Sequence, residues 1–169
     1  MAGLSAQHIA PSSGGFEPQR SYDFQLELYG VPGSELIQLA IAEVTFPMGR
    51  SEPISIEYFA ESRKVAGRLN FSDSRFSCHD YVDENVAGVL MAWRALIIDI
   101  PSGVQGYAPQ YKREGAVVLM GPDGGRERVM KLTGCWPMSV TVDPLSMRSN
   151  DNVMCSVDLA YDTAFPENF

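Results

Sequence analysis

The last third of the chain most constrains its fold, because apolar and polar residues alternate there over a long stretch. Between Val153 and Tyr161 every second side chain is apolar, and Ser156 and Asp158 fall on the other side. A period of two places successive side chains on opposite faces, which is typical of a half-buried β-strand. This region therefore predicts sheet and carries no residues suited to catalysis.

A hairpin is predicted just upstream. Two β-prone runs, residues 116–120 and 126–132, flank the segment Gly121-Pro-Asp-Gly-Gly. Glycine supplies positive φ angles, and the aspartate can accept a hydrogen bond from its own backbone, so the segment favours a tight turn. The two runs are expected to pair as antiparallel strands.

Four more strands are predicted in the first half of the chain. Residues 22–29 alternate and stop at a Gly-Val-Pro-Gly turn. Residues 37–46 alternate but change phase near Ala42 and Glu43, which predicts a long second strand with a bulge or bend. Residues 54–58 and 65–71 are expected to be strands on either side of an exposed charged connection.

One helix is predicted, over residues 86–97, where apolar side chains recur with a 3.6-residue period. Asp83 precedes it as the candidate N-cap. Residues 103–115 contain glycine, proline and charged residues and are expected to form a loop. The predicted fold is mainly β, a β-sandwich or barrel-like arrangement with one packed α-helix.

The length of 169 residues fits one domain with a core of its own. Residues 1–20 are rich in Ala, Ser, Gly and Pro and predict a flexible N-terminal arm, which is either a disordered tail or a segment that orders against a neighbouring subunit. Residues 21–169 are expected to form a single β-rich domain.

The net charge of −8 argues against binding to nucleic acid. Counterion-release binding to phosphates requires clustered Lys and Arg, whereas an acidic surface lets DNA slide past. No basic and apolar leader and no long apolar run are present, so neither a signal peptide nor a membrane contact is expected.

The chain offers little material for an enzyme. It has two histidines, His8 and His79, and the sequence Cys78-His79-Asp80 places neighbouring side chains on opposite faces of a strand. No phosphate-binding glycine motif occurs. We therefore predict no catalytic, cofactor-binding or metal-binding residues and no cofactor. The three cysteines, Cys78, Cys135 and Cys155, are widely spaced and odd in number, which favours free thiols made in a reducing cytoplasm.

Several segments, taken in order, resemble a known family. They are Ser62-Arg-Lys-Val-Ala-Gly before a strand, Val89-Leu-Met-Ala-Trp-Arg in the helix, and Gly134-Cys-Trp-Pro-Met-Ser-Val followed by Leu159-Ala-Tyr-Asp. In this order they resemble the tail tube proteins of contractile-tailed bacteriophages (myoviruses), which are related in fold to the tube proteins of type VI secretion and contractile injection systems. The resemblance covers residues 20–165.

The resemblance implies a structural virion protein that forms stacked hexameric rings of the phage tail tube, a conduit through which DNA is ejected without specific binding. The implied partners are other copies of the chain and the tail sheath, baseplate, tape measure and tail terminator proteins. The implied location is the virion tail, after assembly in the host cytoplasm. Family members often carry alanine or an aliphatic residue where this chain has Cys135, which leaves open a cross-link between subunits through Cys78, Cys135 or Cys155.

Candidate contact residues follow from the strand pattern. Carboxylates opposite apolar core residues, namely Asp23, Glu27 and Asp158, are the candidates for facing the lumen. The exposed connection offers candidates for ring-to-ring contacts, which are Arg50, Glu52, Glu61, Arg63 and Lys64. The alternatives are a baseplate or tail-terminator ring protein of the same fold and the tube protein of an injection system. A small all-β secreted effector is less favoured.

Overall fold

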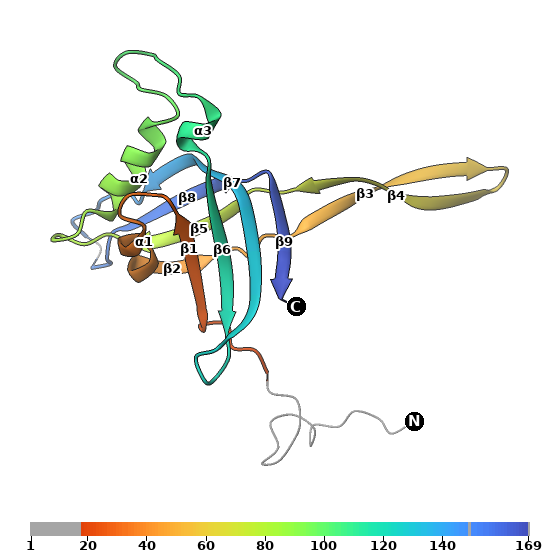
Figure 1. The fold of residues 1–169 in the computed structure, drawn as a ribbon, viewed down its shortest axis with the longest axis horizontal. Coiled ribbons are helices and arrows are strands. Elements are labelled where there is room, and N and C mark those ends of the chain that lie inside the picture. The colour runs from red at the N-terminus through yellow and green to blue at the C-terminus, as the bar shows by residue number, and fades with distance from the viewer. Residues whose placement is uncertain (1–17, 149, 169) are drawn as a thin grey trace.

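The structure is a computed structural model, and it describes residues 18–148 and 150–168. Figure 1 shows a mainly β fold, as the sequence predicts. The elements follow one another as β1 (Phe24–Tyr29), α1 (Ser34–Ala40), β2 (Ile41–Val44), β3 (Gly49–Tyr58), β4 (Glu61–Phe71), β5 (Ser74–His79), α2 (Val86–Ala95), α3 (Ala108–Tyr111), β6 (Arg113–Met120), β7 (Arg126–Val142), β8 (Met154–Ala160) and β9 (Thr163–Asn168).

Seven strands form one antiparallel sheet in the order β1-β6-β7-β8-β5-β2, with β9 also paired to β7. The 17-residue strand β7 belongs to two layers. Its first half pairs with β6 and β9, and its second half pairs with β8. We call β1-β6-β7-β9 the first layer and β7-β8-β5-β2 the second layer. β1 and β2, at the two ends of this path, are not paired with each other among the described strands, so the sheet is open.

Gly134 lies where β7 passes from one layer to the other. Its φ of 65° is in the left-handed region, which glycine adopts without strain. A Cβ atom here would lie 2.2 Å from the Asp162 Oδ2 atom, so a side chain at this position would also have to displace Asp162. Glycine therefore allows the strand to change partners at this point.

The core fills the space between the layers. Its residues alternate along the strands as predicted, and α1 and α2 add their apolar faces to it. The largest buried side chains include Leu26 and Leu28 of β1, Phe76 of β5, Leu132 of β7, Val157 and Leu159 of β8, and Ile37, Leu90 and Trp93 of the helices. The Trp93 Nε1 atom donates a hydrogen bond to the Tyr111 carbonyl oxygen at 2.9 Å, which ties α2 to α3.

The predicted second strand is wrong in its first half, because residues 34–40 form helix α1. The buried residues there are Ile37 and Ala40, three apart as in a helix, whereas Leu39 is 81% exposed. The period-two pattern at Ile37, Leu39 and Ile41 was coincidental. The predicted bend is confirmed, since the pairing of β2 with β5 shifts register between Ile41 and Glu43.

Helix α2 is confirmed, but its cap and its last residue differ from the prediction. Asp83 is exposed, and Asn85 is the N-cap, with its Oδ1 atom accepting from the Gly88 N–H at 2.6 Å. The Asp80 Oδ1 atom also accepts from the first two helical N–H groups, at 3.1 and 3.3 Å. The helix ends at Ala95, two residues before the predicted end.

Two further short elements were missed. The predicted loop of residues 103–115 contains α3 and the start of β6, and β9 adds a strand after the predicted last one. The expectation of a single helix was therefore too low, since three helices occur in the described part of the chain. None of the described helices is long and apolar enough to span a membrane.

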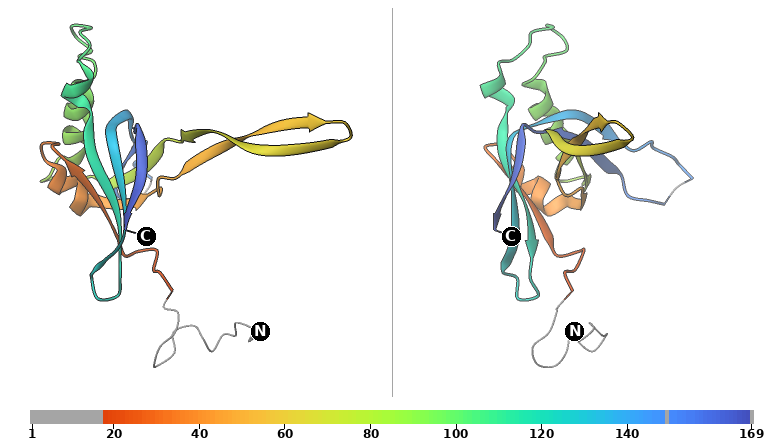
Figure 2. Two further views of the ribbon diagram at one scale, coloured as in Figure 1. Left: turned by 45° about the vertical axis from the view of Figure 1, so that its right-hand side comes forward. Right: turned by 90° about the vertical axis from the view of Figure 1, so that its right-hand side faces the viewer.

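The hairpin of β3 and β4 projects far from the two layers, as Figure 1 and the left view of Figure 2 show. Its strands pair from Gly49 opposite Phe71 to Tyr58 opposite Glu61. The charged residues 61–64 are thus part of β4, at the far end of the hairpin, and do not form the predicted connection between strands. They are exposed, as expected.

Candidate assembly surfaces

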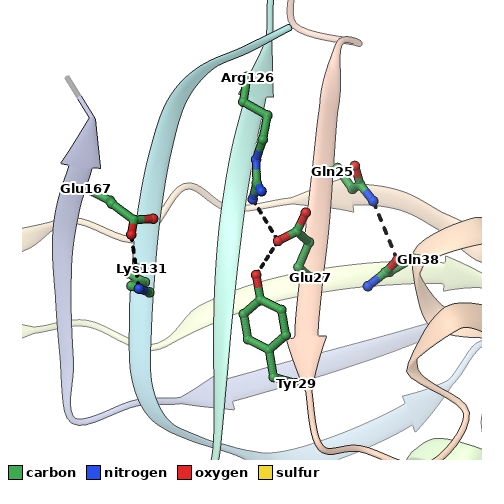
Figure 3. A network of polar contacts seen from close by, with 7 residues as sticks. All are labelled: Gln25, Glu27, Tyr29, Gln38, Arg126, Lys131 and Glu167. Carbon is green, nitrogen blue, oxygen red and sulfur yellow. Dashed lines mark hydrogen bonds and ion pairs between the residues drawn. The ribbon is translucent and has the colours of Figure 1, made fainter. Parts of the chain in front are cut away.

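The outer face of the first layer carries a row of paired polar side chains (Figure 3). Arg126 of β7 forms an ion pair with Glu27 of β1, with an Nη2 to Oε2 distance of 2.8 Å. The Tyr29 hydroxyl donates a hydrogen bond to the same carboxylate oxygen. Farther along the layer, Lys131 of β7 pairs with Glu167 of β9 at 3.1 Å. The face therefore carries polar side chains, and the charges of these four residues are neutralised in pairs.

These contacts change the pKa values of Tyr29 and Arg126. The hydrogen bond to Glu27, together with partial burial, raises the pKa of Tyr29, and the Glu27 charge raises the pKa of Arg126. Both shifts keep the network in one state, a neutral tyrosine and a charged guanidinium beside a carboxylate. Alongside it, Ala116 and Val118 of β6 form a small buried cluster with Val129 of β7, which is the register partner of Val118.

The structure does not bring the three candidate lumen carboxylates together. Glu27 lies on the outer face of the first layer, and Asp23 lies just before β1. Asp158 lies on β8 in the second layer, where it pairs with Arg75 at 2.7 Å and accepts from the Ser139 hydroxyl at 2.5 Å. The hydrogen bonds from Arg75 and Ser139 lower the pKa of Asp158.

The β3–β4 hairpin presents an apolar stripe on one face. Ile54, Ile56 and Tyr58 alternate along β3, Val65 lies opposite Ile54 on β4, and Phe59 occupies the tip. All five are exposed, Phe59 to 94%. The Phe59 φ of 54° lies in the left-handed region, which is uncommon for a residue other than glycine. The turn therefore gives Phe59 an unusual backbone conformation.

The predicted ring-to-ring residues all lie on this hairpin, and all are exposed. They are Arg50 and Glu52 on β3 and Glu61, Arg63 and Lys64 on β4. The Arg63 Nη2 atom lies 3.8 Å from the Glu61 Oε2 atom. An ion pair so exposed contributes well under about 1 kcal/mol to stability, so these charges are available to a partner surface.

The three candidate cross-link thiols are buried inside the core. Cys78 and Cys155 are register partners on β5 and β8, Cys135 lies on β7, and all three are free. Burial raises the pKa of Cys78 and of Cys135 to about 12 and raises that of Cys155 as well. Within one folded subunit none of them reaches the surface.

The described residues contain no group of three His, Cys, Asp or Glu side chains placed to hold a metal ion. In the Cys78-His79-Asp80 segment, the thiol is in the core and the aspartate caps α2. His79 is half-buried, and its Nδ1 atom has no hydrogen-bond partner. The segment thus has a structural explanation at two of its three positions. His8 lies outside the described residues.

The fold, with its two-layer sheet, flanking helices and projecting hairpin, is similar to that of tube and cap proteins of contractile injection systems. The chain matches no known family profile and no curated protein sequence. Its fold is similar to that of a chain in the sheath–tube complex of an extracellular contractile injection system, PVC (TM-score 0.68, 15% identity, covering 90% of this chain and 93% of that one).

Two further structures share the fold. One is the tube-terminating cap of the anti-feeding prophage, with a TM-score of 0.71 and 14% identity, covering 95% of this chain and 97% of that one. The other is Hcp1 from Flavobacterium johnsoniae, with a TM-score of 0.52 and 9% identity over 88% and 97%. The similarity spans nearly the whole of each chain and establishes a common fold.

Proposed function

We propose that this chain is a structural subunit of the tube of a contractile tail or tail-like injection device, in which six copies form a ring and rings stack around a lumen. The fold similarity over nearly all of both chains carries the proposal. The finer assignment is a bacteriophage tail tube in the virion, assembled in the host cytoplasm. It works with sheath, baseplate, tape measure and terminator proteins, and DNA passes through its lumen. The role is structural and needs neither catalysis nor a cofactor.

We place the lumen on the outer face of the first layer. On this polar surface, Arg126 and Lys131 are paired with carboxylates. Because DNA phosphates bind to unpaired cations, DNA can pass such a surface without adhering. Glu27 would then face the lumen, with Asp23 at its margin. Asp158, on the second layer, would face outward toward a neighbour or the sheath.

We place ring stacking on the hairpin. It projects from the body (Figure 2). It carries the apolar stripe together with the exposed charged residues Arg50, Glu52, Glu61, Arg63 and Lys64. An exposed apolar stripe of this kind is typical of a protein interface. The N-terminal arm, also expected to join subunits, lies outside the described residues except for residues 18–20.

Negative-stain electron microscopy of the purified chain, beside size-exclusion chromatography over a range of concentrations, tests the proposal. Rings or hollow filaments are expected. A variant with Phe59→Ser and Ile56→Ser should remain folded, because both side chains are exposed, and should form rings that no longer stack. A monomer at every concentration would contradict the proposal.

The terminal ring is a second candidate function, favoured by the similarity to the tube-terminating cap over 95% of this chain. A cap closes one end of a tube, so it should form single rings and no filaments. Open-ended filaments of the chain alone would favour the tube subunit, and single rings at high concentration would favour the cap.

A further inference from the structure

A cavity of about 620 Å³ lies between the start of β1, the end of β6 and the strands β2, β5 and β8. Much of its wall is apolar, formed by Phe24, Val44, Phe46, Phe76, Leu119 and Met154. Ser77 also lines it, although this side chain is only 8% exposed, and its Oγ atom has no hydrogen-bond partner among the described residues. Buried polar atoms are normally hydrogen-bonded, so the wall is suited to receiving a further group.

The loop between β7 and β8 begins and ends at this cavity. Asp143 and Met154 both line the cavity, and the Asp143 N–H donates a hydrogen bond to the Met154 carbonyl oxygen at 3.0 Å. Asp143 also borders a second hollow of about 510 Å³, which the loop itself encloses. The right view of Figure 2 shows the loop standing out from the second layer. The loop is therefore anchored beside the cavity without filling it.

The first part of this loop, residues 144–148, carries side chains suited to an apolar cavity, and we call it the strap. Leu145 is 80% exposed, and Met147 is as exposed as in an extended chain, at 108%. Methionine is unbranched and flexible, so it fills irregular apolar spaces well. The Arg148 N–H donates to the Ser146 hydroxyl oxygen at 3.2 Å, a bond within the strap that can persist when the strap moves.

We infer that the strap closes over the cavity in the free subunit and places Leu145 and Met147 inside it. Four residues of extended chain span roughly 13 Å, so Met147 can enter the cavity while Asp143 stays in its wall. Closure removes two exposed apolar surfaces from water, the cavity wall and the strap. Because both ends of the loop are already fixed at the cavity, the loss of conformational entropy is confined to a short segment. The strap's backbone groups also become available as partners for the Ser77 hydroxyl.

The charges around the cavity favour the same occupant. Arg148 is the one charged residue of the strap, and two exposed carboxylates, Glu43 and Asp143, line the cavity. Arg75 lines it too, but the charge of its guanidinium is already paired with Asp158 at 2.7 Å. Closure therefore brings an unlike charge toward Glu43. It acts within a single copy and covers an apolar surface that otherwise favours non-specific association.

Methionine oxidation in dilute protein tests the closure. Met147 and Met48 are 108% and 64% exposed in the open arrangement, so without closure hydrogen peroxide should oxidise Met147 at least as fast as Met48. With closure we expect Met147 to be oxidised at least about fivefold more slowly, because a buried thioether is protected. Mass spectrometry of tryptic peptides measures both rates. Thr45→Trp, at an exposed position of the cavity lining, should block the cavity and restore fast oxidation, whereas Leu39→Trp, exposed on α1 outside the lining, should not.

Disulfide trapping identifies the occupant, because the three native thiols are buried and give little background. A Thr45→Cys, Met147→Cys variant, oxidised with glutathione disulfide, is expected to form a link within one chain. A Thr45→Cys, Phe59→Cys variant is the matched control and should form no such link, since Figure 1 shows the hairpin tip far from β2. Mixing isotope-labelled and unlabelled chains separates links within a chain from links between chains.

The outcomes separate this inference from the proposed function. A link between positions 45 and 147 of one chain, together with slow oxidation of Met147, supports the strap. Links formed only between chains would assign the cavity to a neighbouring copy and overturn it. Absence of any link, with Met147 oxidised as fast as Met48, would also overturn it. In both of the last two cases the tube proposal stands, because rings and filaments are observed independently by electron microscopy.

Discussion

At the scale of single residues, the burial of the three cysteines decides whether subunits can be linked by disulfides. All three are fully buried, so a disulfide between folded subunits is not available. In the native protein we expect fewer than about 0.1 thiols per chain to react with a thiol-specific reagent within minutes at pH 8, and three after unfolding, because reaction requires an exposed thiolate. A disulfide-linked dimer on a non-reducing gel of native particles would contradict this.

The same thiols predict a loss of stability in alkali. Folding raises the pKa of Cys78 and Cys135 from 9.0 to about 12. The unfolded state therefore loses these protons first, and stability falls as pH rises from 9 toward 12. At pH 10 the loss is on the order of 1 kcal/mol per thiol. Urea unfolding at pH 8 and pH 10 measures it, and a Cys78→Ala, Cys135→Ala variant should show a smaller difference between the two.

Two aspartates near the start of α2 are expected to differ in their effect on stability, because Asp80 accepts hydrogen bonds from the helix and Asp83 is exposed. Asp80→Ala removes an acceptor for the Val86 and Ala87 N–H groups and should lower the free energy of unfolding by about 1 kcal/mol. Asp83→Ala, at the exposed position that the sequence favours as N-cap, should change it by less than about 0.5 kcal/mol. Equal effects in thermal unfolding would count against the assignment of Asp80.

At the scale of elements, the bend in β7 depends on Gly134. Gly134→Ala would adopt a left-handed conformation at a cost of roughly 1–2 kcal/mol, and its Cβ would displace Asp162 from the ion pair with Lys112. Gly124→Ala has a similar φ of 77° with open space around it, so it pays the conformational cost alone. We expect Gly134→Ala to be the more destabilising by at least about 1 kcal/mol in urea unfolding. If the two variants lose the same free energy of unfolding, the prediction is wrong, and Asp162 can move away from the new Cβ at no cost.

The strands could be predicted from sequence where one face is buried and the other wet. This holds for β1 and β8, whose alternation reports burial directly. It fails for residues 34–40, because a seven-residue helix offers only two buried positions and its pattern also fits a strand. It fails again for β9, whose short sequence contains Pro166 and whose order depends on pairing with β7, a contact distant in sequence.

At the scale of the whole molecule, the sequence identified which residues are exposed more readily than which surface they share. The charges of residues 50–64 were expected to be exposed, and they are, but their place on one long hairpin depends on the pairing of β3 with β4. Glu27 and Asp158 looked equivalent as carboxylates opposite core residues. Only the passage of β7 between the layers separates them, because it puts their strands on different layers.

That separation gives a test of which layer lines the lumen. On the first layer Glu27 and Glu167 neutralise Arg126 and Lys131, so the double variant Glu27→Gln, Glu167→Gln leaves two cations per copy unpaired. Assembled tubes of this variant should retain short single-stranded DNA at 50 mM salt, release it at 200 mM salt, and protect it from nuclease, because clustered cations bind phosphates by counterion release.

Asp158→Asn is the matched control, since it frees Arg75 on the second layer. Any DNA that it binds should lie outside the tube and be digested, whereas tubes of the unaltered chain should bind none. Fluorescence anisotropy measures the binding, and gel analysis after nuclease measures the protection. Protection by Asp158→Asn tubes, with none by the double variant, would place the lumen on the second layer, because a wall surrounding the DNA is what excludes the nuclease.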